Sequence, residues 1–290
     1  MIQSMTGFGK ASTELERRKV TVEVKSLNSK QLDLSVRLPN LYKEHEMEIR
    51  NRLSRQLERG KVDFLVYVEN IGNETPTQIN QSIVEGYYNQ IKESARKLGI
   101  DTPADWYQVI LRMPDVLKYE SQEVDESEWN AVSKVIDEAV KQLLAFRKQE
   151  GEMLENLFKE KVANISSLLT EIEPFEAERV EKIKVRITEA LHKIEDFDYD
   201  KNRFEQEMIY YIEKLDINEE KSRLTNHLGY FLETMQSGTG QGKKLGFIAQ
   251  EMGREINTMG SKSNHADMQQ IVVRMKDELE QIKEQVLNVL

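Results

Sequence analysis

The sequence predicts an α+β protein that is mainly helical overall, and three observations support this prediction. Apolar and polar residues alternate along two stretches of the first seventy residues, with the period of two that half-buried strands require. No proline follows Pro174, and the segment after it is rich in Glu, Lys, Gln and Met, which favour helices. Apolar residues there recur every three or four positions, as they do along one face of a helix.

The N-terminal segment is predicted to be a small mixed domain with a few strands. Two strands are expected at 20–25 and 32–37, where valine and leucine alternate with polar side chains, and a third at 62–68. A helix is expected between the second and third strands, from about residue 42 to 57, because its apolar residues are spaced by four. The opening segment 4–9 is expected to add an edge strand.

Helices are predicted to dominate from residue 78 onward. One helix carries an apolar line from Ile83 to Leu98, and a shorter one covers 106–113. A long helical pattern runs over 126–172, and the same spacing resumes after Pro174. We expect these two runs to pack on each other as a helical hairpin. The alternative is a projecting arm of coiled-coil character that serves oligomer assembly.

The C-terminal part is predicted to hold three further helices, at 200–235, 243–257 and 267–289. The glycine-rich segment 237–242 lies between the first two and is predicted to be a flexible loop. A length of 290 residues suggests two domains, since single cores seldom grow much beyond roughly 250 residues. Read by pattern, the chain divides into the segments 1–75, 76–200 and 201–290.

Composition limits the functions that the chain can have. It contains no cysteine, which excludes a disulfide framework, a thiolate zinc site, an iron–sulfur cluster and a cysteine nucleophile, and which fits a reducing cytoplasm. Its longest apolar runs are far short of the roughly 20 residues that span a membrane, so no membrane partner is expected. A net charge of −10 argues against nucleic-acid binding through bulk charge, but not against a local basic channel.

The glycine-rich loop and the lysines that follow it suggest a contact with phosphate. A nucleotide-binding P-loop is excluded, because that motif needs four residues between its glycines and a Ser or Thr after its lysine, whereas Lys244 follows Lys243. A glycine loop that leads into a helix start still offers N–H groups and positive charge to a phosphate. A linker with solvated lysines explains the same residues equally well.

The helix after this loop carries a polar stripe beside its apolar face. Gln250, Arg254 and Asn257 form the stripe, so amides and an arginine stand where Lys and Glu pairs are usual. Glu251 and Glu255 lie next to it, four residues apart, and can bind one divalent cation through oxygen. An intrahelical salt bridge between Glu251 and Arg254 is the structural alternative.

Upstream, Glu220, Arg223 and His227 share one helical stripe at spacings of three and four. A carboxylate and an arginine near an imidazole suit a metal ligand, or a general acid/base tuned near neutrality. A structural histidine is the alternative interpretation. Of the other histidines, His265 lies at a predicted helix start beside Asp267.

Basic residues are concentrated in one short part of the N-terminal segment, where the single acidic residue is Glu58. Such a cluster is the electrostatic footprint expected for a polyanion in an otherwise acidic chain, although a solvated helix face is the ordinary explanation. The cluster comprises Arg50, Arg52, Arg55, Arg59 and Lys61.

Several segments together match a known family. At the N-terminal end these are 4–9 (SMTGFG), 24–30 (VKSLNSK), 37–39 (RLP) and 59–62 (RGKV). Towards the C-terminal end they are 219–227 (EEKSRLTNH) and the signature that runs from GKKL at 242 through QEM and REINT to GSKS at 260–263. On these residues the chain resembles the YicC/YloC family of stress-induced endoribonucleases. The helical middle matches in character and length more than in residues.

This resemblance implies an endoribonuclease of the bacterial cytoplasm. It implies ring-like hexamers that cut single-stranded or structured RNA and depend on a divalent metal, typically manganese. The chain departs from the family at two positions, since the family usually has Asp in place of Gly246 and Asn in place of Gly253. If either side chain binds metal in relatives, the site of this chain is altered. The retained polar set is Gln250, Glu251, Arg254, Glu255 and Asn257.

Combining the residues with the resemblance gives a hypothesis for the site. Glu251, Glu255 and His227 are expected to be catalytic, and the same three with Glu220 are expected to bind Mn²⁺, or Mg²⁺ as the second choice, which would activate water or the leaving oxygen. In the metal-independent alternative, His227 acts as the base on the 2′-hydroxyl. The residues expected to contact RNA are Lys243, Lys244, Arg254, Lys262, Arg223, Arg50, Arg55, Arg59 and Lys61.

Two other classes of function fit the same residues. The chain can be a non-catalytic RNA-binding oligomer, an adaptor that presents RNA to other nucleases, and the glycines at 246 and 253 favour this slightly. It can also be a purely structural coiled-coil assembly protein. Salt-sensitive binding of RNA through Lys243 and Lys244 would argue against the structural reading.

Overall fold

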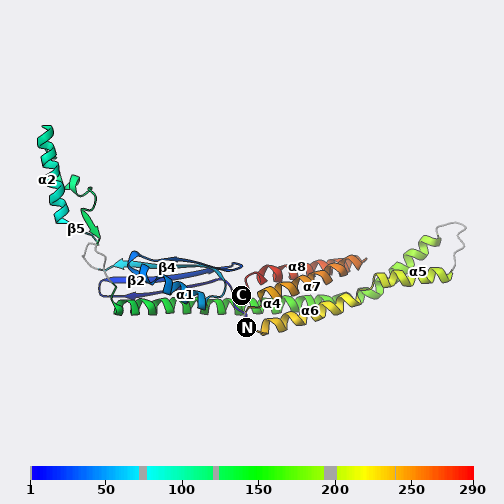
Figure 1. Ribbon diagram of the computed structural model, residues 1–290. Coiled ribbons are helices and arrows are strands. Elements are labelled where there is room, and N and C mark those ends of the chain that lie inside the picture. Colours follow the sequence, from blue (N-terminus) through cyan, green and yellow to red (C-terminus); the bar gives the residue numbers. More distant parts are fainter. Residues whose placement is uncertain (1, 72–76, 120–123, 193–200, 239) are drawn as a thin grey trace.

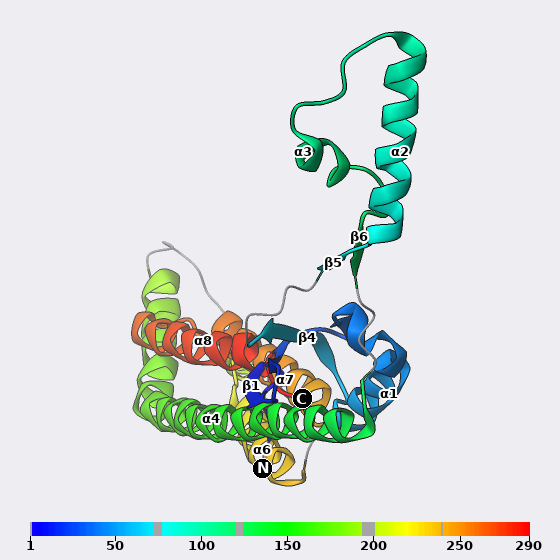
Figure 2. The ribbon, with the colours of Figure 1, turned by 90° about the vertical axis from the view of Figure 1, so that its left-hand side faces the viewer.

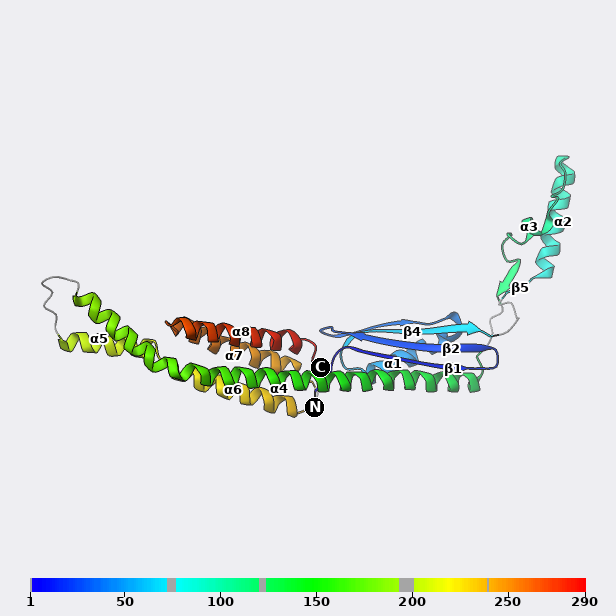
Figure 3. The same cartoon turned by 180° about the vertical axis from the view of Figure 1, so that it is seen from behind.

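The computed structural model describes residues 2–71, 77–119, 124–192, 201–238 and 240–290. The molecule is elongated, with a sheet at one end and a bundle of helices at the other (Figures 1 and 3). One long helix, α4 (Glu126–His192), runs beside both parts. The α+β architecture, mainly helical overall, is as the sequence predicts.

The N-terminal part is a four-stranded sheet covered on one face. Its strands are β1 (Gly7–Glu14), β2 (Arg18–Leu27), β3 (Leu32–Arg37) and β4 (Gly60–Asn70), in the order β1-β2-β4-β3. Strand β2 is antiparallel to β1 and β4, whereas β3 is parallel to β4. The predicted alternation is confirmed, because Val20, Val22 and Val24 are fully buried while the residues between them are not. The edge strand begins at Gly7 rather than at residue 4.

A helix joins the two parallel strands and closes this core. The chain passes from β3 through a 3₁₀ turn (Asn40–His45) into α1 (Glu46–Gln56), which is shorter than the predicted helix 42–57. Ile49 and Leu53 of α1 pack in one cluster with the buried valines of the sheet and with the first part of α4. Gly9 of β1 lies against α4 so closely that a Cβ there would stand 1.9 Å from the Ala139 carbonyl oxygen.

A separate segment projects from the sheet, as Figure 2 shows. It consists of β5 (Thr77–Ile79), α2 (Gln81–Leu98), α3 (Trp106–Ile110) and β6 (Leu117–Tyr119). The helices fall where the sequence predicts them, but the β5–β6 pair was not predicted, since three residues are too few to show alternation. The buried apolar residues of this segment are Ala95, Ile110 and Val116.

The predicted hairpin around Pro174 is wrong. Helix α4 is continuous over 67 residues, and Pro174 lies inside it. A proline removes one backbone hydrogen bond from a helix, but the apolar residues before Pro174, such as Ile165 and Ile172, are buried against the C-terminal helices and hold the helix direction. The chain reverses direction after the end of α4, before α5 (Lys201–Lys214), and not at Pro174. The connection 193–200 lies outside the described residues.

The C-terminal helices pack on the second half of α4. They are α6 (Asn218–Gln236), α7 (Gly242–Lys262) and α8 (Ala266–Val286). The predicted helix 200–235 is interrupted between α5 and α6, where Ile217 is fully buried, and the predicted helix 243–257 continues to Lys262. Residues of α4, α6, α7 and α8 form one apolar core. Helix α4 therefore serves both cores, and the segment bounds 1–75, 76–200 and 201–290 stay a prediction.

The two chain ends meet where the sheet and the bundle join (Figure 1). Leu290 N–H donates to the Gln3 carbonyl oxygen at 2.9 Å, and Met5 N–H donates to that of Asn288 at 2.8 Å. Arg147 of α4 is buried at this junction, and its Nη2 donates to Ser26 Oγ at 2.5 Å. The junction is thus held by polar contacts among distant parts of the sequence. In the part of the chain that the structure describes, no helix combines the length and apolar character of a membrane span.

Candidate functional site

Helices α6 and α7 lie side by side and antiparallel, and they bring most of the predicted site residues together along what we call the α6–α7 seam. At one end of the seam the Lys244 ammonium lies 4.6 Å from the centroid of the Tyr230 ring. At the other end Lys262 Nζ lies 2.8 Å from Glu220 Oε1. These two contacts are about 27 Å apart along α7. They bracket Arg223 and His227 on α6, and Glu251 and Glu255 on α7.

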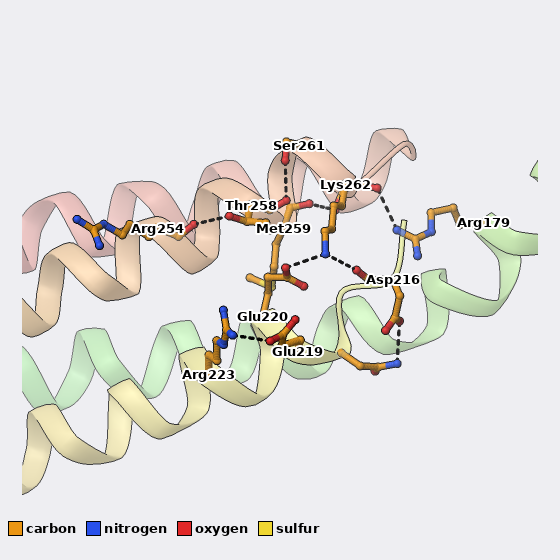
Figure 4. Close-up of polar contacts among 12 residues, drawn as sticks. Arg179, Asp216, Glu219, Glu220, Arg223, Arg254, Thr258, Met259, Ser261 and Lys262 are labelled. Atoms are coloured by element: carbon orange, nitrogen blue, oxygen red, sulfur yellow. Dashed lines mark hydrogen bonds and ion pairs between the residues drawn. The ribbon is translucent and has the colours of Figure 1, made fainter. Parts of the chain in front are cut away.

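The Glu220–Lys262 ion pair joins α6 to α7 at one end of the seam, as Figure 4 shows. Glu220 is buried, and Lys262 Nζ also donates to the Asp216 carbonyl oxygen at 2.9 Å. The second carboxylate oxygen of Glu220, Oε2, is buried without a hydrogen-bond partner among the described residues. RNA binding by Lys262 would require this pair to open, and metal binding by Glu220 would require access to its buried Oε2.

The middle of the seam carries the intrahelical pair that the sequence allows as an alternative to a metal site. Arg254 Nη1 lies 3.1 Å from Glu251 Oε1, and the Arg254 side chain is 73% exposed whereas that of Glu251 is 20% exposed. Arg254 Nη1 also donates a hydrogen bond to Glu251 Oε2 at 3.3 Å, whereas Oε1 has no hydrogen-bond partner among the described residues. Glu255 and His227 are half-buried, and the exposed Arg223 pairs with Glu219. Of the two arginines in the middle of the seam, Arg254 at 73% is more exposed than Arg223 at 57%.

A metal would have few ligands from one chain. Within the described residues, no three or more His, Asp or Glu side chains are grouped so that they could hold an ion. Glu251 and Glu255 offer two carboxylates one turn apart on α7. Mg²⁺-like ions are commonly bound by one or two carboxylates, with substrate phosphates and water completing the shell. The donor set therefore fits such an ion only together with oxygens from outside the chain.

The start of α7 is less open to phosphate than its glycine-rich sequence suggests. Gly242 N–H donates to the Leu290 carbonyl oxygen at 3.1 Å, so the first amide of the helix already has an acceptor. A Cβ at Gly242 would stand 2.3 Å from the Val289 carbonyl oxygen, which explains the glycine there. Lys243 and Lys244 are exposed beside this closed contact. The charge of the predicted phosphate site is accessible, while one of its amides is not.

The two glycines that depart from the family pattern do not lie beside Glu251 and Glu255. Both face α8, where a Cβ at Gly246 would meet Val286 Cγ1 at 3.6 Å and one at Gly253 would meet Leu279 Cδ2 at 3.3 Å. They occupy the side of α7 opposite to the two glutamates. In this chain these positions therefore serve the packing of α7 on α8.

Some side chains of the basic cluster in the N-terminal part are hydrogen-bonded within the chain, and others are exposed to solvent. Arg50 Nε donates to Glu46 at 2.8 Å, and Arg59 Nε donates to the Ser29 carbonyl oxygen at 2.8 Å. Arg55 and Lys61 are exposed. These two are therefore the members of the predicted cluster with the most accessible charge.

The C-terminal residues 287–290 link the region around the start of β4 to the start of α7. Asn28 Nδ2 donates to the Leu287 carbonyl oxygen at 2.6 Å. The next residue, Ser29, accepts the hydrogen bond from Arg59. Leu290, three residues after Leu287, accepts from Gly242. The structure thus brings Lys61 and Lys243 to the same junction of sheet and bundle, although they are far apart in sequence. Tyr230, which the sequence analysis did not single out, stands three residues after His227.

Two family models together match most of the chain. Residues 2–156 match the family model described as the endoribonuclease YicC-like N-terminal region, and residues 172–290 match the model described as endoribonuclease YicC-like, C-terminal. The chain therefore belongs to the YicC family, as its motifs predict.

Two curated relatives span the same length. A protein of Clostridioides difficile (strain 630), named "Probable endoribonuclease YicC", is 32% identical over 295 residues, which cover 100% of both chains. A protein of the same name from Haemophilus influenzae is 28% identical over 299 residues, which cover 99% of both chains.

Proposed function

We propose that the protein is an endoribonuclease that cleaves RNA phosphodiester bonds at the α6–α7 seam. The observation that carries this proposal is the contact of Lys244 with the Tyr230 ring at the head of a seam that contains Glu251 and Glu255. A cation beside an aromatic face suits a phosphate and an adjacent base of single-stranded RNA. Membership of the family and the names of both relatives support the same activity.

The residues of the seam have separate roles in this proposal. Lys243, Lys244 and Arg254 bind phosphates, because their charges are exposed on one helix. Glu251 and Glu255 hold Mn²⁺ or Mg²⁺ together with phosphate oxygens. When bound, such an ion polarises a phosphoryl oxygen and lowers the pKa of bound water.

His227 is the proton-transfer group in the metal-independent alternative. Its half-buried place on α6 lies between the Tyr230 and Glu220 contacts. Attack by the 2′-hydroxyl must leave a 2′,3′-cyclic phosphate, whereas attack by activated water can leave a 5′-phosphate. Analysis of the product ends separates the two routes.

The cleavage test compares two matched pairs of glutamates. Glu251→Ala/Glu255→Ala removes the proposed carboxylates of α7, and Glu280→Ala/Glu284→Ala removes exposed glutamates at the same spacing on α8. With labelled RNA and Mn²⁺, the first variant is expected to lose at least about 100-fold in rate, and the second to match wild type. Equal cleavage by all three proteins would refute the proposed carboxylate site.

Assembly and location complete the proposal. We place the protein in the cytoplasm as a ring-like homo-oligomer, a hexamer by the family resemblance. A ring could gather the accessible cations Lys61, Lys243 and Arg254 of several copies on one surface. Sedimentation equilibrium tests this, because a species with the mass of one 33.8 kDa chain at micromolar concentration would contradict it.

An RNA adaptor without catalytic activity is the second candidate. The observation that favours it is the lack, among the described residues, of a grouped set of three metal ligands. Its signature in the cleavage test is salt-sensitive RNA binding, weakened by Lys243→Glu/Lys244→Glu, with no cleavage by any of the proteins.

A further inference from the structure

A second region that contains cations lies next to the Glu220–Lys262 pair, where the start of α8 meets the second half of α4. It is a pocket of about 300 Å³, and Ile183 and Ala266 contribute to its wall. Figure 4 shows Arg179 of α4 next to Lys262 at this place. The polar residues that line the pocket are Arg179, Lys182, Arg186, Asn264, His265 and Asp267.

Arg179 is a buried cation with unused hydrogen-bonding capacity. Its side chain belongs to a residue that is 4% exposed, and its Nη1 donates to the Lys262 carbonyl oxygen at 3.2 Å. Its Nε is buried without a hydrogen-bond partner among the described residues. Burial lowers the pKa of the guanidinium, while the charges of Glu176 and Asp216 raise it. An arginine remains charged under these conditions.

His265 presents a second donor without an acceptor. Its side chain is 5% exposed, and its Nε2 lies 3.2 Å from Lys182 Nζ. A lysine ammonium can only donate, so Nε2 accepts and the ring proton is on Nδ1. Nδ1 is buried and has no hydrogen-bond partner among the described residues. The nearest carboxylates, those of Asp267 at 3.7 Å from Nδ1 and Glu178 at 3.9 Å from Nε2, are too far for hydrogen bonds.

The start of α8 opens into the same pocket. His265 is the residue that precedes this 21-residue helix, and its side chain does not cap it. The first helical hydrogen bond runs from Gln269 N–H to the His265 carbonyl oxygen, so no intrahelical acceptor is available to the amides of residues 266–268. Uncapped amides and the helix dipole attract an anion.

We propose that this pocket, the α8 anion pocket, binds a phosphate group between Arg179, His265 and the first amides of α8. The pocket joins the cations of Lys182 and Arg186 to two buried donors, and a buried donor that stays unpaired destabilises the fold. Asp267 within the pocket and Glu178, at 2.6 Å from Lys182, reduce the positive charge, and Glu176 and Asp216 act on Arg179 in the same sense. The two unpaired buried donors, and not the net charge, therefore carry the proposal. A doubly charged phosphate supplies the acceptors that both buried donors lack.

The first test uses inorganic phosphate and the full chain. At constant ionic strength set with chloride, phosphate is expected to raise the Tm of the wild-type protein saturably. Lys182→Gln/Arg186→Gln removes two cations of the pocket rim and is expected to weaken this effect at least about tenfold. Lys148→Gln/Lys184→Gln removes two exposed cations from α4 outside the pocket and is expected to behave as wild type.

The second test separates a free phosphate from the terminal phosphate of a nucleic acid, and this arm rests on RNA binding. Fluorescence anisotropy compares an RNA oligonucleotide with a 5′-phosphate and the same oligonucleotide with a 5′-hydroxyl. Tighter binding of the 5′-phosphate form, abolished by Lys182→Gln/Arg186→Gln, assigns the pocket to an RNA end. Equal binding of both forms, with the phosphate-dependent Tm shift retained, assigns it to a free phosphate or a small phosphorylated molecule.

Two results would overturn the proposal. One is a Tm that responds to phosphate no more than to chloride of equal ionic strength. The other is a phosphate response that is unchanged in Lys182→Gln/Arg186→Gln. Because neither readout involves RNA cleavage, failure of the pocket and failure of the proposed nuclease activity are distinguishable.

Discussion

Glu220 and Lys262 join α6 to α7 through an ion pair whose side chains are 6% and 28% exposed. A buried carboxylate keeps its charge at low cost only while its partner is present, so the two residues act as a unit. Arg223 and Glu219 form a second pair on the same helix, but their side chains are 57% and 65% exposed. Exposed pairs contribute little to stability, because water and salt screen them. The two pairs therefore give matched tests of burial.

Lys262→Met is expected to destabilise the protein by about 2 kcal/mol, because it leaves the Glu220 carboxylate buried and unpaired. Glu220→Gln/Lys262→Met is expected to recover part of this loss, since no uncompensated charge remains. Arg223→Met, the exposed control, is expected to change the free energy of unfolding by less than about 0.5 kcal/mol. Urea unfolding measures all three, and coincident midpoints for the three variants would contradict the role of burial.

Asp125 gives a pH-dependent prediction at the start of α4. Its Oδ1 accepts from Glu128 N–H at 2.6 Å, and this hydrogen bond lowers the pKa of the Asp125 carboxyl. A carboxyl with a lowered folded-state pKa contributes stability above its unfolded value of about 3.9 and loses that contribution as pH falls through the folded value. The Tm of wild type should exceed that of Asp125→Ala by a constant amount at neutral pH, and the gap should shrink below about pH 4.

The control for this prediction is Asp101→Ala, at an exposed aspartate outside the helices. Its Tm is expected to run parallel to that of wild type at every pH. A wild-type advantage over Asp125→Ala that persists undiminished down to pH 2 would show that the carboxylate hydrogen bond is not its source.

Among the secondary-structure elements, α4 determines how the rest of the chain is arranged. Its length of 67 residues corresponds to about 100 Å. The first part carries the sheet, where β1 and β2 contact it, and the second part carries α6 and α8. Close approach between α4 and its neighbours depends on residues without a side chain, as at Gly9 and Gly151.

Gly9→Ala is expected to destabilise the protein by about 3 kcal/mol or to prevent folding, because the added Cβ overlaps the Ala139 carbonyl oxygen of α4. Gly86→Ala is the control within an exposed helix, where the added Cβ meets no atom within 4 Å. It is expected to stabilise the protein by about 0.5–1 kcal/mol through helix propensity. Thermal unfolding of the two variants measures both effects, and equal Tm values would contradict the close contact of β1 with α4.

For the molecule as a whole, the projecting segment 77–119 differs from the rest in what it contacts. Its strands pair with each other and α2 packs on α3. Several large apolar side chains of this segment are exposed, among them Leu98 at 71% and Tyr107 at 79%. The remainder of the molecule has two extensive buried cores joined by α4.

Replacement of residues 77–119 by a short Gly–Ser linker is expected to leave the helical content of the remainder and its Tm unchanged within a few degrees. The reason is that this segment contributes little to either buried core. Circular dichroism and thermal unfolding make the measurement. A shortened chain that is unfolded or aggregated would show that the segment supports the folded state of the full protein.

The sequence by itself determined much of the local structure and the family. Strand alternation located β2, β3 and β4 because one face of the sheet is buried and the other is not. Apolar spacing located α7 and α8 for the same reason. The motifs at both ends identified the family without any geometry. Each of these features depends on residues close together in sequence.

The tertiary structure alone decided how distant residues meet. Whether Pro174 ends a helix depends on packing against α6 and α8, which a local pattern does not contain. Pairing of Glu220 with Lys262 and the closure of the α7 start by Leu290 join residues more than forty positions apart. The same holds for Arg179 and His265, whose unpaired donors become visible only when α4 and α8 enclose them and exclude water. Burial is a property of the packed whole, and it fixes which charges are structural and which are free to bind.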